Sequence, residues 1–233
     1  MQTTTILFDL DGTLTDPKPG ITRCIQHALT ELGYQPPESE SLQWCIGPPL
    51  RQSFSRLLGS SDGQLLEQAV ELYRQRFSTV GLFENRVYKG VPETLADLRR
   101  QGHRLFLATA KPRIFAEQIL EHFGLAQFFE TAHGSELNGH LTDKSSLVRH
   151  ILAVEHLAPE RTMIIGDRKY DIVGGKVNGL ATGAVTYGYG TVEELHAEGP
   201  DAVFDSPEQI LTHPPFARGR AYLAGNGAEG VKE

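Results

Sequence analysis

The chain has 233 residues with 39% hydrophobic and 22% charged residues, which is the composition of an ordinary globular protein with a sizeable core. Its formal net charge is −7, from 22 Lys and Arg against 29 Asp and Glu, so a nucleic-acid partner is not expected. No apolar run reaches the roughly 18 residues of a membrane span, and no secretory signal opens the chain, so we expect a cytoplasmic protein with no membrane contact.

Short apolar runs that end in small or acidic residues recur along the chain. Runs of this kind are typical of buried parallel strands, and the segments between them have the apolar spacing of amphipathic helices. Strand and helix in alternation predict an α/β fold with a Rossmann-like open parallel sheet. The predicted strands are TTILFDLD at 4–11, HRLFLATA at 103–110, FFETAHGS at 128–135, TMIIGD at 162–167, TGAVTYG at 182–188 and DAVFD at 201–205.

The interval between the first two strands is far longer than the roughly 10 to 12 residues that a strand-to-strand crossover needs. Residues 20–34, 48–59 and 62–81 of this interval place apolar residues at the i, i+3, i+4 and i+7 positions of a helix. The interval is therefore predicted to be helical. It holds more helices than a single crossover would need.

These patterns divide the chain into two predicted domains and a tail. Residues 1–15 and 87–213 form the α/β core, and residues 16–86 form an all-helical cap inserted into it at two hinges. Residues 214–233 show no apolar period and are predicted to be a flexible tail.

Two aspartates, Asp9 and Asp11, follow the first strand in the sequence FDLDGT. Side chains two residues apart on a strand point to the same side, so both carboxylates are expected at the carboxyl edge of the sheet, where open α/β folds bind ligands. A lone aspartate there is often only a turn former or a helix cap. Two adjacent carboxylates raise each other's pKa unless a positive charge lies between them, so we expect a bound cation or a shared proton.

A second acidic pair follows the strand TMIIGD, where Asp167 ends the strand and Asp171 lies in the first turn of the next helix. By itself this pattern also fits a helix cap. Together with the first pair it gives four carboxylates at two strand ends. Hard oxygen ligands without His or Cys suit Mg²⁺, which also accepts a substrate phosphate as a ligand.

Two further residues fit a phosphate site. Thr109 ends the strand LFLATAKP, where its hydroxyl and the following backbone N–H groups could hold a phosphate oxygen at a helix N-terminus. Lys144 begins a helix in the sequence LTDKSSL, where it gains nothing from the helix dipole. Lys111 is the rival candidate, and any one lysine is more often only a solvated surface residue.

Taken in order, the segments FDLDGTLTD, LATAK, TDK and IIGDRKYDI resemble the four motifs of the haloacid dehalogenase superfamily. The match extends from about residue 5 to about residue 210, with a helical cap inserted after the first motif as in the phosphoglycolate phosphatase-like branch. The resemblance implies a phosphoric monoester hydrolase that uses Mg²⁺ and acts on a small phosphorylated metabolite.

The resemblance also implies a role for each matching residue. Asp9 is expected to be the nucleophile that forms an aspartyl-phosphate, and Asp11 the acid for the leaving alcohol and then the base for water. Asp171 is expected near the metal or bound to it through water. The full implied set is Asp9, Asp11, Asp167 and Asp171 for the metal, with Thr109, Ala110 and Lys144 for the phosphate.

The sequence also narrows the reaction class. Dehalogenases of the superfamily lack an aspartate at the position of Asp11, and Thr13 resembles the phosphatases more than the sugar-phosphate mutases. A binding module without catalysis would be expected to carry a Gly-rich phosphate loop after the first strand, and none is present. A 5′-nucleotidase or a phosphotransferase that shares the aspartyl-phosphate stays an alternative.

The cap is expected to select the substrate by closing over the site. Its segment CIGPPLRQSF resembles a loop that faces the active site in related phosphatases. Arg51 in this segment could pair with a second anionic group of the substrate, or it could be a surface residue of an amphipathic helix. Phosphoglycolate and nucleoside 5′-monophosphates both stay open as substrates, and a monomer or a homodimer is expected.

Overall fold

The structure, a computed structural model, describes residues 4–212; the predicted tail at 214–233 lies outside the described residues. All six apolar runs form strands, and all six strands lie in one parallel sheet. The predicted Rossmann-like open parallel sheet is therefore confirmed. The strands are β1 (Thr5–Phe8), β4 (Arg104–Pro112), β5 (Thr131–Ser135), β6 (Thr162–Gly166), β7 (Ala181–Val185) and β8 (Ala202–Phe204). Their order across the sheet is β5-β4-β1-β6-β7-β8.

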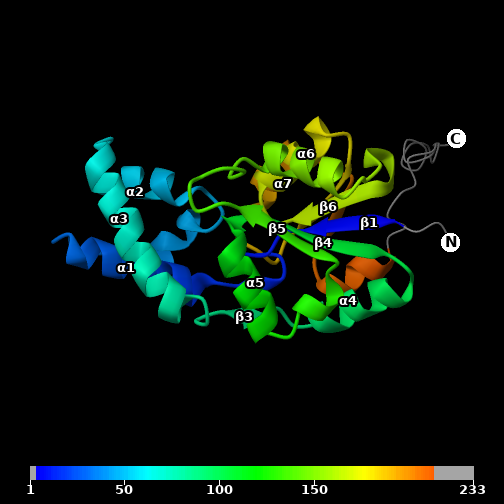
Figure 1. Cartoon of the computed structure of the whole chain (residues 1–233), viewed down its shortest axis with the longest axis horizontal. Coiled ribbons are helices and arrows are strands. Elements are labelled where there is room, and N and C mark those ends of the chain that lie inside the picture. The colour runs from blue at the N-terminus through cyan, green and yellow to red at the C-terminus, as the bar shows by residue number, and fades with distance from the viewer. Residues whose placement is uncertain (1–3, 213–233) are drawn as a thin grey trace, which may run out of the picture.

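Helices cover both faces of this sheet. In β1, Ile6 and Phe8 belong to one apolar cluster and Leu7 to the other, because successive strand residues point to opposite faces. Helices α4 and α5 pack with the first cluster, and α6 and α7 lie on the other face (Figure 1). The helices that follow residue 90 are α4 (Val91–Arg100), α5 (Arg113–His122), α6 (Lys144–Val154), α7 (Lys169–Val177) and α8 (Val192–Ala197).

Residues 16–86, which we call the cap segment, are mostly helical, as the spacing of their apolar residues predicts. The segment lies beyond the carboxyl ends of the strands (Figure 1). Its division from the core as a separate domain stays a prediction. The helices are α1 (Lys18–Glu31), α2 (Leu50–Leu58) and α3 (Gly63–Arg76), with a 3-10 helix at Ser39–Cys45 and a π-helical turn at Phe77–Gly81 that the apolar spacing did not distinguish.

The chain enters and leaves the cap segment at two neighbouring points. A two-stranded antiparallel sheet joins β2 (Thr15–Asp16) to β3 (Arg86–Val87). Arg86 Nη2 donates to Asp16 Oδ2 at 2.8 Å. The two connections are therefore tied to each other by backbone pairing and by an ion pair.

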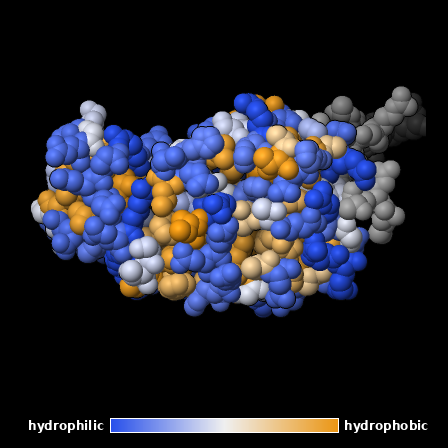
Figure 2. Space-filling model, in the orientation of Figure 1, coloured by the Kyte–Doolittle hydropathy of each residue, from blue (hydrophilic) through white to orange (hydrophobic). Residues whose placement is uncertain are grey.

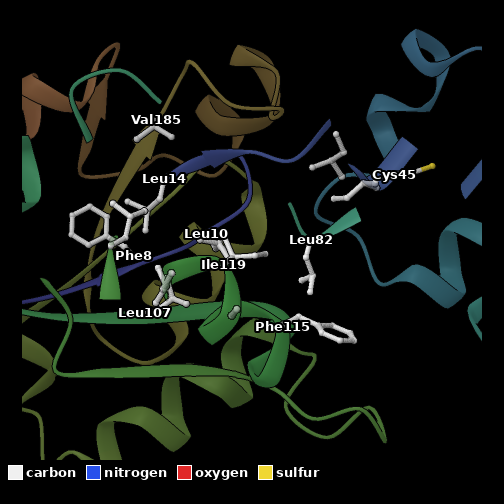
Figure 3. Close-up of a cluster of buried hydrophobic side chains, with 14 of the residues drawn as sticks. Phe8, Leu10, Leu14, Cys45, Leu82, Leu107, Phe115, Ile119 and Val185 are labelled. Carbon is white, nitrogen blue, oxygen red and sulfur yellow. The ribbon is translucent and has the colours of Figure 1, made fainter. Parts of the chain in front are cut away.

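One apolar cluster runs from the sheet into the cap segment. It contains Phe8 of β1, Leu10 just beyond that strand, Phe115 of α5, and Leu82 and Cys45 of the cap segment (Figure 3). The cap segment thus packs against the core through apolar side chains as well as through its two chain connections. Burial of such side chains is the main source of folding stability.

Polar residues cover most of the face of the cap segment that Figure 2 shows. Its helices are amphipathic, and in α2 Ser53 and Phe54 are buried while Arg51 and Gln52 are exposed. Across residues 4–212, no helix is both long enough and apolar enough to cross a membrane.

Candidate active site

Asp9 follows β1 at the carboxyl edge of the sheet, between β4 and β6. Its backbone N–H donates to Ile165 O of β6 at 2.9 Å, which continues the strand pairing one residue beyond β1. The side chain is buried. Asp9 therefore has a fixed backbone position where β1 and β6 end and where β4 continues beside them.

The chain turns sharply after Asp9, and this turn places Asp11. Gly12 N donates to Thr15 O at 2.8 Å, and Gly12 has a φ of +83°, where a side chain is disfavoured. A Cβ at Gly12 would also collide with the Asp167 carboxylate. The glycine thus lets the turn approach the second acidic pair.

Asp167 and Asp171 reach the same place from β6 and α7. Asp167 directly follows β6, and Asp171 lies in the first turn of α7, where its Oδ2 accepts from Arg168 N at 3.2 Å. Both carboxyl groups are fully buried. One carboxylate oxygen each of Asp9, Asp167 and Asp171 lies within 4.8 Å of the other two.

Lys144, the first residue of α6, inserts its ammonium group among these carboxylates. Its Nζ lies 3.1 Å from Asp9 Oδ1 and 2.7 Å from Asp171 Oδ1, and donates to Ala108 O at 2.8 Å. The helix is capped by Asp143, whose carboxylate accepts from Ser146 N. The lysine side chain is 5% exposed, so it is a buried partner of the acidic cluster and not the solvated residue that most lysines are.

Burial and the charges of the neighbouring groups shift the pKa values of the residues in this cluster. Burial raises the pKa of Asp167 well above its ordinary value, and the charges of Asp9 and Asp171 raise it further. Burial also raises the pKa of Asp171 to about 6, although Lys144 opposes this shift. Burial by itself would lower the pKa of Lys144, but Asp171 and Asp9 outweigh it and raise that pKa.

The chemistry of the donor set fits a divalent cation. Asp167 Oδ1 is buried and has no hydrogen-bond partner among the described residues, which is costly unless something positive binds it. When all groups are ionised, the negative charges exceed the positive ones by two, the charge of one Mg²⁺. The groups counted are the carboxylates of Asp9, Asp11, Asp167 and Asp171 and the ammonium groups of Lys111 and Lys144.

The structure places Thr109 and Ala110 beside the cluster but corrects one expectation about them. Strand β4 continues to Pro112 and α5 begins only at Arg113, so Thr109 does not lie at a helix N-terminus. Lys111 N instead donates to Thr109 Oγ1 at 3.3 Å. Ala110 lines the cavity described below, whereas Thr109 is buried and is not among its lining residues.

A cavity of about 220 Å³ opens between the acidic cluster and the cap segment. Gln52 lines it from α2, whereas Arg51 pairs with Glu67 of α3 and its side chain is 50% exposed. The structure therefore places Arg51 outside the cavity lining. The lining residues are Asp9, Gly47, Pro49, Gln52, Ala110, Thr142, Asp143, Lys144, Arg168, Tyr170 and Asp171.

Sequence reasoning missed several residues at this site. Arg168 and Tyr170 lie within the quoted IIGDRKYDI segment, yet their spacing gave no reason to choose them. Tyr189 N donates to Asp167 Oδ2 at 2.8 Å, and Tyr189 OH donates to Asp16 of β2. The signal that could have found this loop is its position after β7, because loops at the carboxyl edge of a parallel sheet line the ligand site.

Comparison with protein families shows one match that covers most of the described chain. A family model described as haloacid dehalogenase-like hydrolase matches residues 6–185. The matched range begins at the second residue of β1 and reaches every strand of the sheet except β8. It contains all four acidic residues. It also contains the whole cap segment.

Three relatives illustrate the activities found among similar proteins. A 5′-nucleotidase of Pseudomonas aeruginosa is 48% identical over 195 residues, which are 84% of this chain and 88% of that protein. The tyrosine-protein kinase PtkA of Mycobacterium tuberculosis is 38% identical over 188 residues, 81% of this chain but only 64% of the kinase. A phosphoglycolate phosphatase of Pseudomonas putida is 28% identical over 212 residues, 88% of this chain and 78% of the enzyme.

Solved structures with the same architecture are also found. The crystal structure of a protein described as "a predicted phosphatase" from Clostridium acetobutylicum superposes with a TM-score of 0.86 and 37% sequence identity. The superposition covers 91% of this chain and 100% of that one. The similarity therefore includes the cap segment as well as the sheet.

Proposed function

Because this chain belongs to the haloacid dehalogenase-like hydrolase family, we propose that it hydrolyses a small phosphomonoester with Mg²⁺ through an aspartyl-phosphate on Asp9. The family and its phosphatase relatives identify the enzyme class as a phosphoric monoester hydrolase. Within this class, the metal ion, the aspartyl-phosphate intermediate and the substrate are our proposals. The observation that carries them is the contact of Lys144 with Asp9 and Asp171 within a buried cluster of three carboxylates.

Asp9 is proposed as the nucleophile because it lies at the centre of the site and is held from its backbone. Its carboxylate oxygen attacks phosphorus, the bond between phosphorus and the leaving oxygen breaks, and the phosphoryl group stays on Asp9. Water then attacks the same phosphorus atom. This second step releases inorganic phosphate and regenerates the Asp9 carboxylate.

Asp11 is proposed to move the protons. Burial raises its pKa, although Lys111 opposes this shift, so burial favours the protonated form that a general acid needs. Asp11 would give this proton to the leaving oxygen. It would then take a proton from the water that attacks the aspartyl-phosphate.

Mg²⁺ would be held by Asp9, Asp167 and the backbone carbonyl of Asp11, with Asp171 nearby, and would offset the charge on the phosphate oxygens. Lys144 and the Thr109 hydroxyl would orient the transferred group, with Ala110 N beside them. The contacts of Lys144 Nζ with the carboxylates of Asp9 and Asp171 support this role.

A nucleoside 5′-monophosphate is the substrate that we favour. The 48% identity to a 5′-nucleotidase supports it, and so does the lining of the cavity. Phosphoglycolate carries a carboxylate that needs a cationic partner, but the lining cations Lys144 and Arg168 are both already engaged by carboxylates. The cap side instead offers the neutral amide of Gln52, and the core side offers the ring of Tyr170.

A phosphotransferase is the second candidate, because the similarity to a tyrosine-protein kinase covers 81% of this chain. It would share the aspartyl-phosphate and differ only in the acceptor. A cytoplasmic location and a monomeric or homodimeric state stay predictions from the sequence.

The test is phosphate release from nucleoside monophosphates, phosphoglycolate and sugar phosphates, with Mg²⁺ and with EDTA. We expect Mg²⁺-dependent release with a nucleoside monophosphate ranked first. A first rank for phosphoglycolate would overturn the substrate proposal and keep the hydrolase. Release that is unchanged in EDTA would overturn the metal. Consumption of the phosphomonoester only when a hydroxyl acceptor is added, with the phosphoryl group recovered on that acceptor and not as inorganic phosphate, would favour the phosphotransferase.

A further inference from the structure

Arg168 lies where the core meets the cap segment. It is the residue between Asp167 and α7, its side chain is 11% exposed, and it lines the cavity. An arginine in such a place has three plausible partners, namely the substrate, the core or the cap segment. The contacts of its guanidinium group decide among them.

The core holds one side of the guanidinium. Arg168 Nε donates to Glu194 Oε1 at 2.9 Å, and Nη2 donates to Glu194 Oε2 at 3.3 Å. Glu194 is itself fixed in the first turn of α8, where its Oε1 also accepts from Lys169 N at 3.0 Å. A two-point contact between arginine and carboxylate fixes the plane of the guanidinium.

The other side of the guanidinium contacts the cap segment. Arg168 Nη1 donates to the backbone carbonyl of Ile46, 122 residues away in the sequence. A charged donor to a carbonyl in a partly buried place makes a stronger hydrogen bond than a neutral donor. This bond therefore ties the chain before α2 to the chain before α7.

Gly47 gives a second, independent observation in support of this contact, because only a residue without a side chain leaves room for the arginine. Its φ is +103°, and a Cβ there would lie 2.8 Å from Arg168 Nη1 and 3.1 Å from Arg168 Cγ. The guanidinium thus occupies the space that a side chain at position 47 would need. Gly47, Pro49 and Gln52 then line the cavity opposite Asp9.

We propose that Arg168 is a positioning residue which, braced by Glu194, holds loop 46–49 of the cap segment closed over Asp9. Each of the three guanidinium nitrogens donates one hydrogen bond in this arrangement, two to Glu194 and one to Ile46 O. Opening the loop for substrate entry requires the bond to Ile46 O to break. The bond to Glu194 stays intact and keeps the guanidinium in place for the next closure.

Hydrogen–deuterium exchange of residues 44–52 tests this proposal in the absence of any substrate. We expect Arg168→Met and Glu194→Gln each to speed exchange in this segment, Arg168→Met by about tenfold, the factor that corresponds to a weak charge-assisted hydrogen bond. Exchange in peptides of β1 and β6 is expected to stay at the level of the original protein. Arg99→Met, which removes a half-exposed arginine of α4 that pairs with Glu130, is the matched control.

Three outcomes would overturn the proposal. Unchanged exchange at 44–52 in Arg168→Met would mean that the loop is held by other contacts. Faster exchange in Arg168→Met with no change in Glu194→Gln would mean that Glu194 is not a brace. A rise of equal size in β1 and β6 would also count against it, because that pattern reports general destabilisation.

The catalytic consequence of the proposal depends on the proposed function and is measured separately. We expect kcat/KM for the best phosphomonoester to fall more than kcat/KM for acetyl phosphate, which is too small to use the cap side of the cavity. Equal losses for the two substrates would contradict a role in closing the loop. Hydrogen–deuterium exchange is measured without substrate. Its result therefore still tests the role of Arg168 even if no phosphomonoester is hydrolysed and the proposed function is wrong.

Discussion

Lys111 and Asp11 form a buried ion pair, with Lys111 Nζ 2.8 Å from Asp11 Oδ2 and 2.9 Å from Oδ1. The same ammonium group lies 4.8 Å from the centre of the Phe77 ring, at the end of the cap segment. Lys144 contacts Asp9 and Asp171 instead. The two lysines thus pair with different acidic residues, and of the two only Lys144, which the sequence favoured over Lys111, contacts the proposed nucleophile.

Replacing each lysine separately tests this division. We expect Lys144→Ala to reduce phosphate release by about 10²-fold or more, because it removes a fixed positive charge from the phosphate position. Lys111→Ala is expected to reduce it much less, because the carboxylate that it frees can still transfer protons. Steady-state rates for the two variants provide the comparison. The reverse ranking would assign the phosphate to Lys111.

Replacing the nucleophile should separate folding from catalysis. Asp9→Asn is expected to keep the fold, because the isosteric amide relieves repulsion among the carboxylates, while phosphate release falls by about 10³-fold or more. Thermal unfolding and rate assays on the same sample measure both effects. Asp62→Asn, at the exposed N-cap of α3, is the control and should change neither. A rate near that of the original protein would remove Asp9 from the role of nucleophile.

Metal binding should be visible in stability as well as in activity. We expect Mg²⁺ to raise the free energy of unfolding by about 2.7 kcal/mol at a hundredfold excess over its Kd, because it neutralises buried carboxylates. EDTA should remove this gain, and Asp167→Asn should abolish most of it. Thermal unfolding at constant ionic strength is the measurement. A gain that persists in Asp167→Asn would place the ion elsewhere.

His133 should make the stability depend on pH. Burial lowers the pKa of His133, although Glu155, at 2.9 Å, opposes the shift, and His150 and Arg113 nearby add to it. The unfolded chain, in which a histidine has a pKa of about 6.5, then binds the proton more readily than the folded chain. The contribution of His133 to stability is therefore full above about pH 6.5 and is lost as the pH falls below it.

Urea unfolding at several pH values checks this sign. His133→Gln should show a smaller loss of stability below about pH 6.5 than the original protein. Replacing the exposed His140 with Gln should leave the pH dependence as it was. An unchanged dependence in His133→Gln would show that other groups are responsible.

Gln52 and Arg51 are adjacent in α2 but face different surroundings. Gln52 lines the cavity, whereas Arg51 pairs with Glu67 at the surface. We expect Gln52→Ala to raise KM by about twofold to tenfold, the range for one neutral hydrogen bond, and Arg51→Ala to raise it less. KM for the best substrate of each variant is the measurement. A larger rise in Arg51→Ala would restore the role that the sequence suggested for this arginine.

The sheet and the acidic residues could be predicted because their signals are local. Runs such as Ile6, Leu7 and Phe8 are apolar on both sides, which fits a strand buried on both faces, and Asp9 follows such a run directly. Parallel strands bring their carboxyl ends to one edge. Residues from distant segments could therefore be expected at the same edge from the sequence pattern alone.

Contacts that depend on tertiary placement could not be predicted in this way. In the cap segment, Arg168 donates to the backbone carbonyl of Ile46. Since every residue has a backbone carbonyl, no sequence pattern could identify this acceptor. The extension of β4 to Pro112 was missed for a related reason. The pairing of Pro112 with Ser135 of β5 and the ion pair of Lys111 with Asp11 hold this segment extended, and both partners lie far away in the sequence.

The position of β1 in the middle of the sheet sets the order in which the protein can become active during its synthesis. β1 is made first, but it needs β4 on one side and β6 on the other. A growing chain can form the helices of the cap segment early, since their contacts are local. It cannot hold Asp9 beside Asp167 until β6 and the residue after it have left the ribosome, so the nascent chain carries the proposed nucleophile before the rest of the acidic cluster exists.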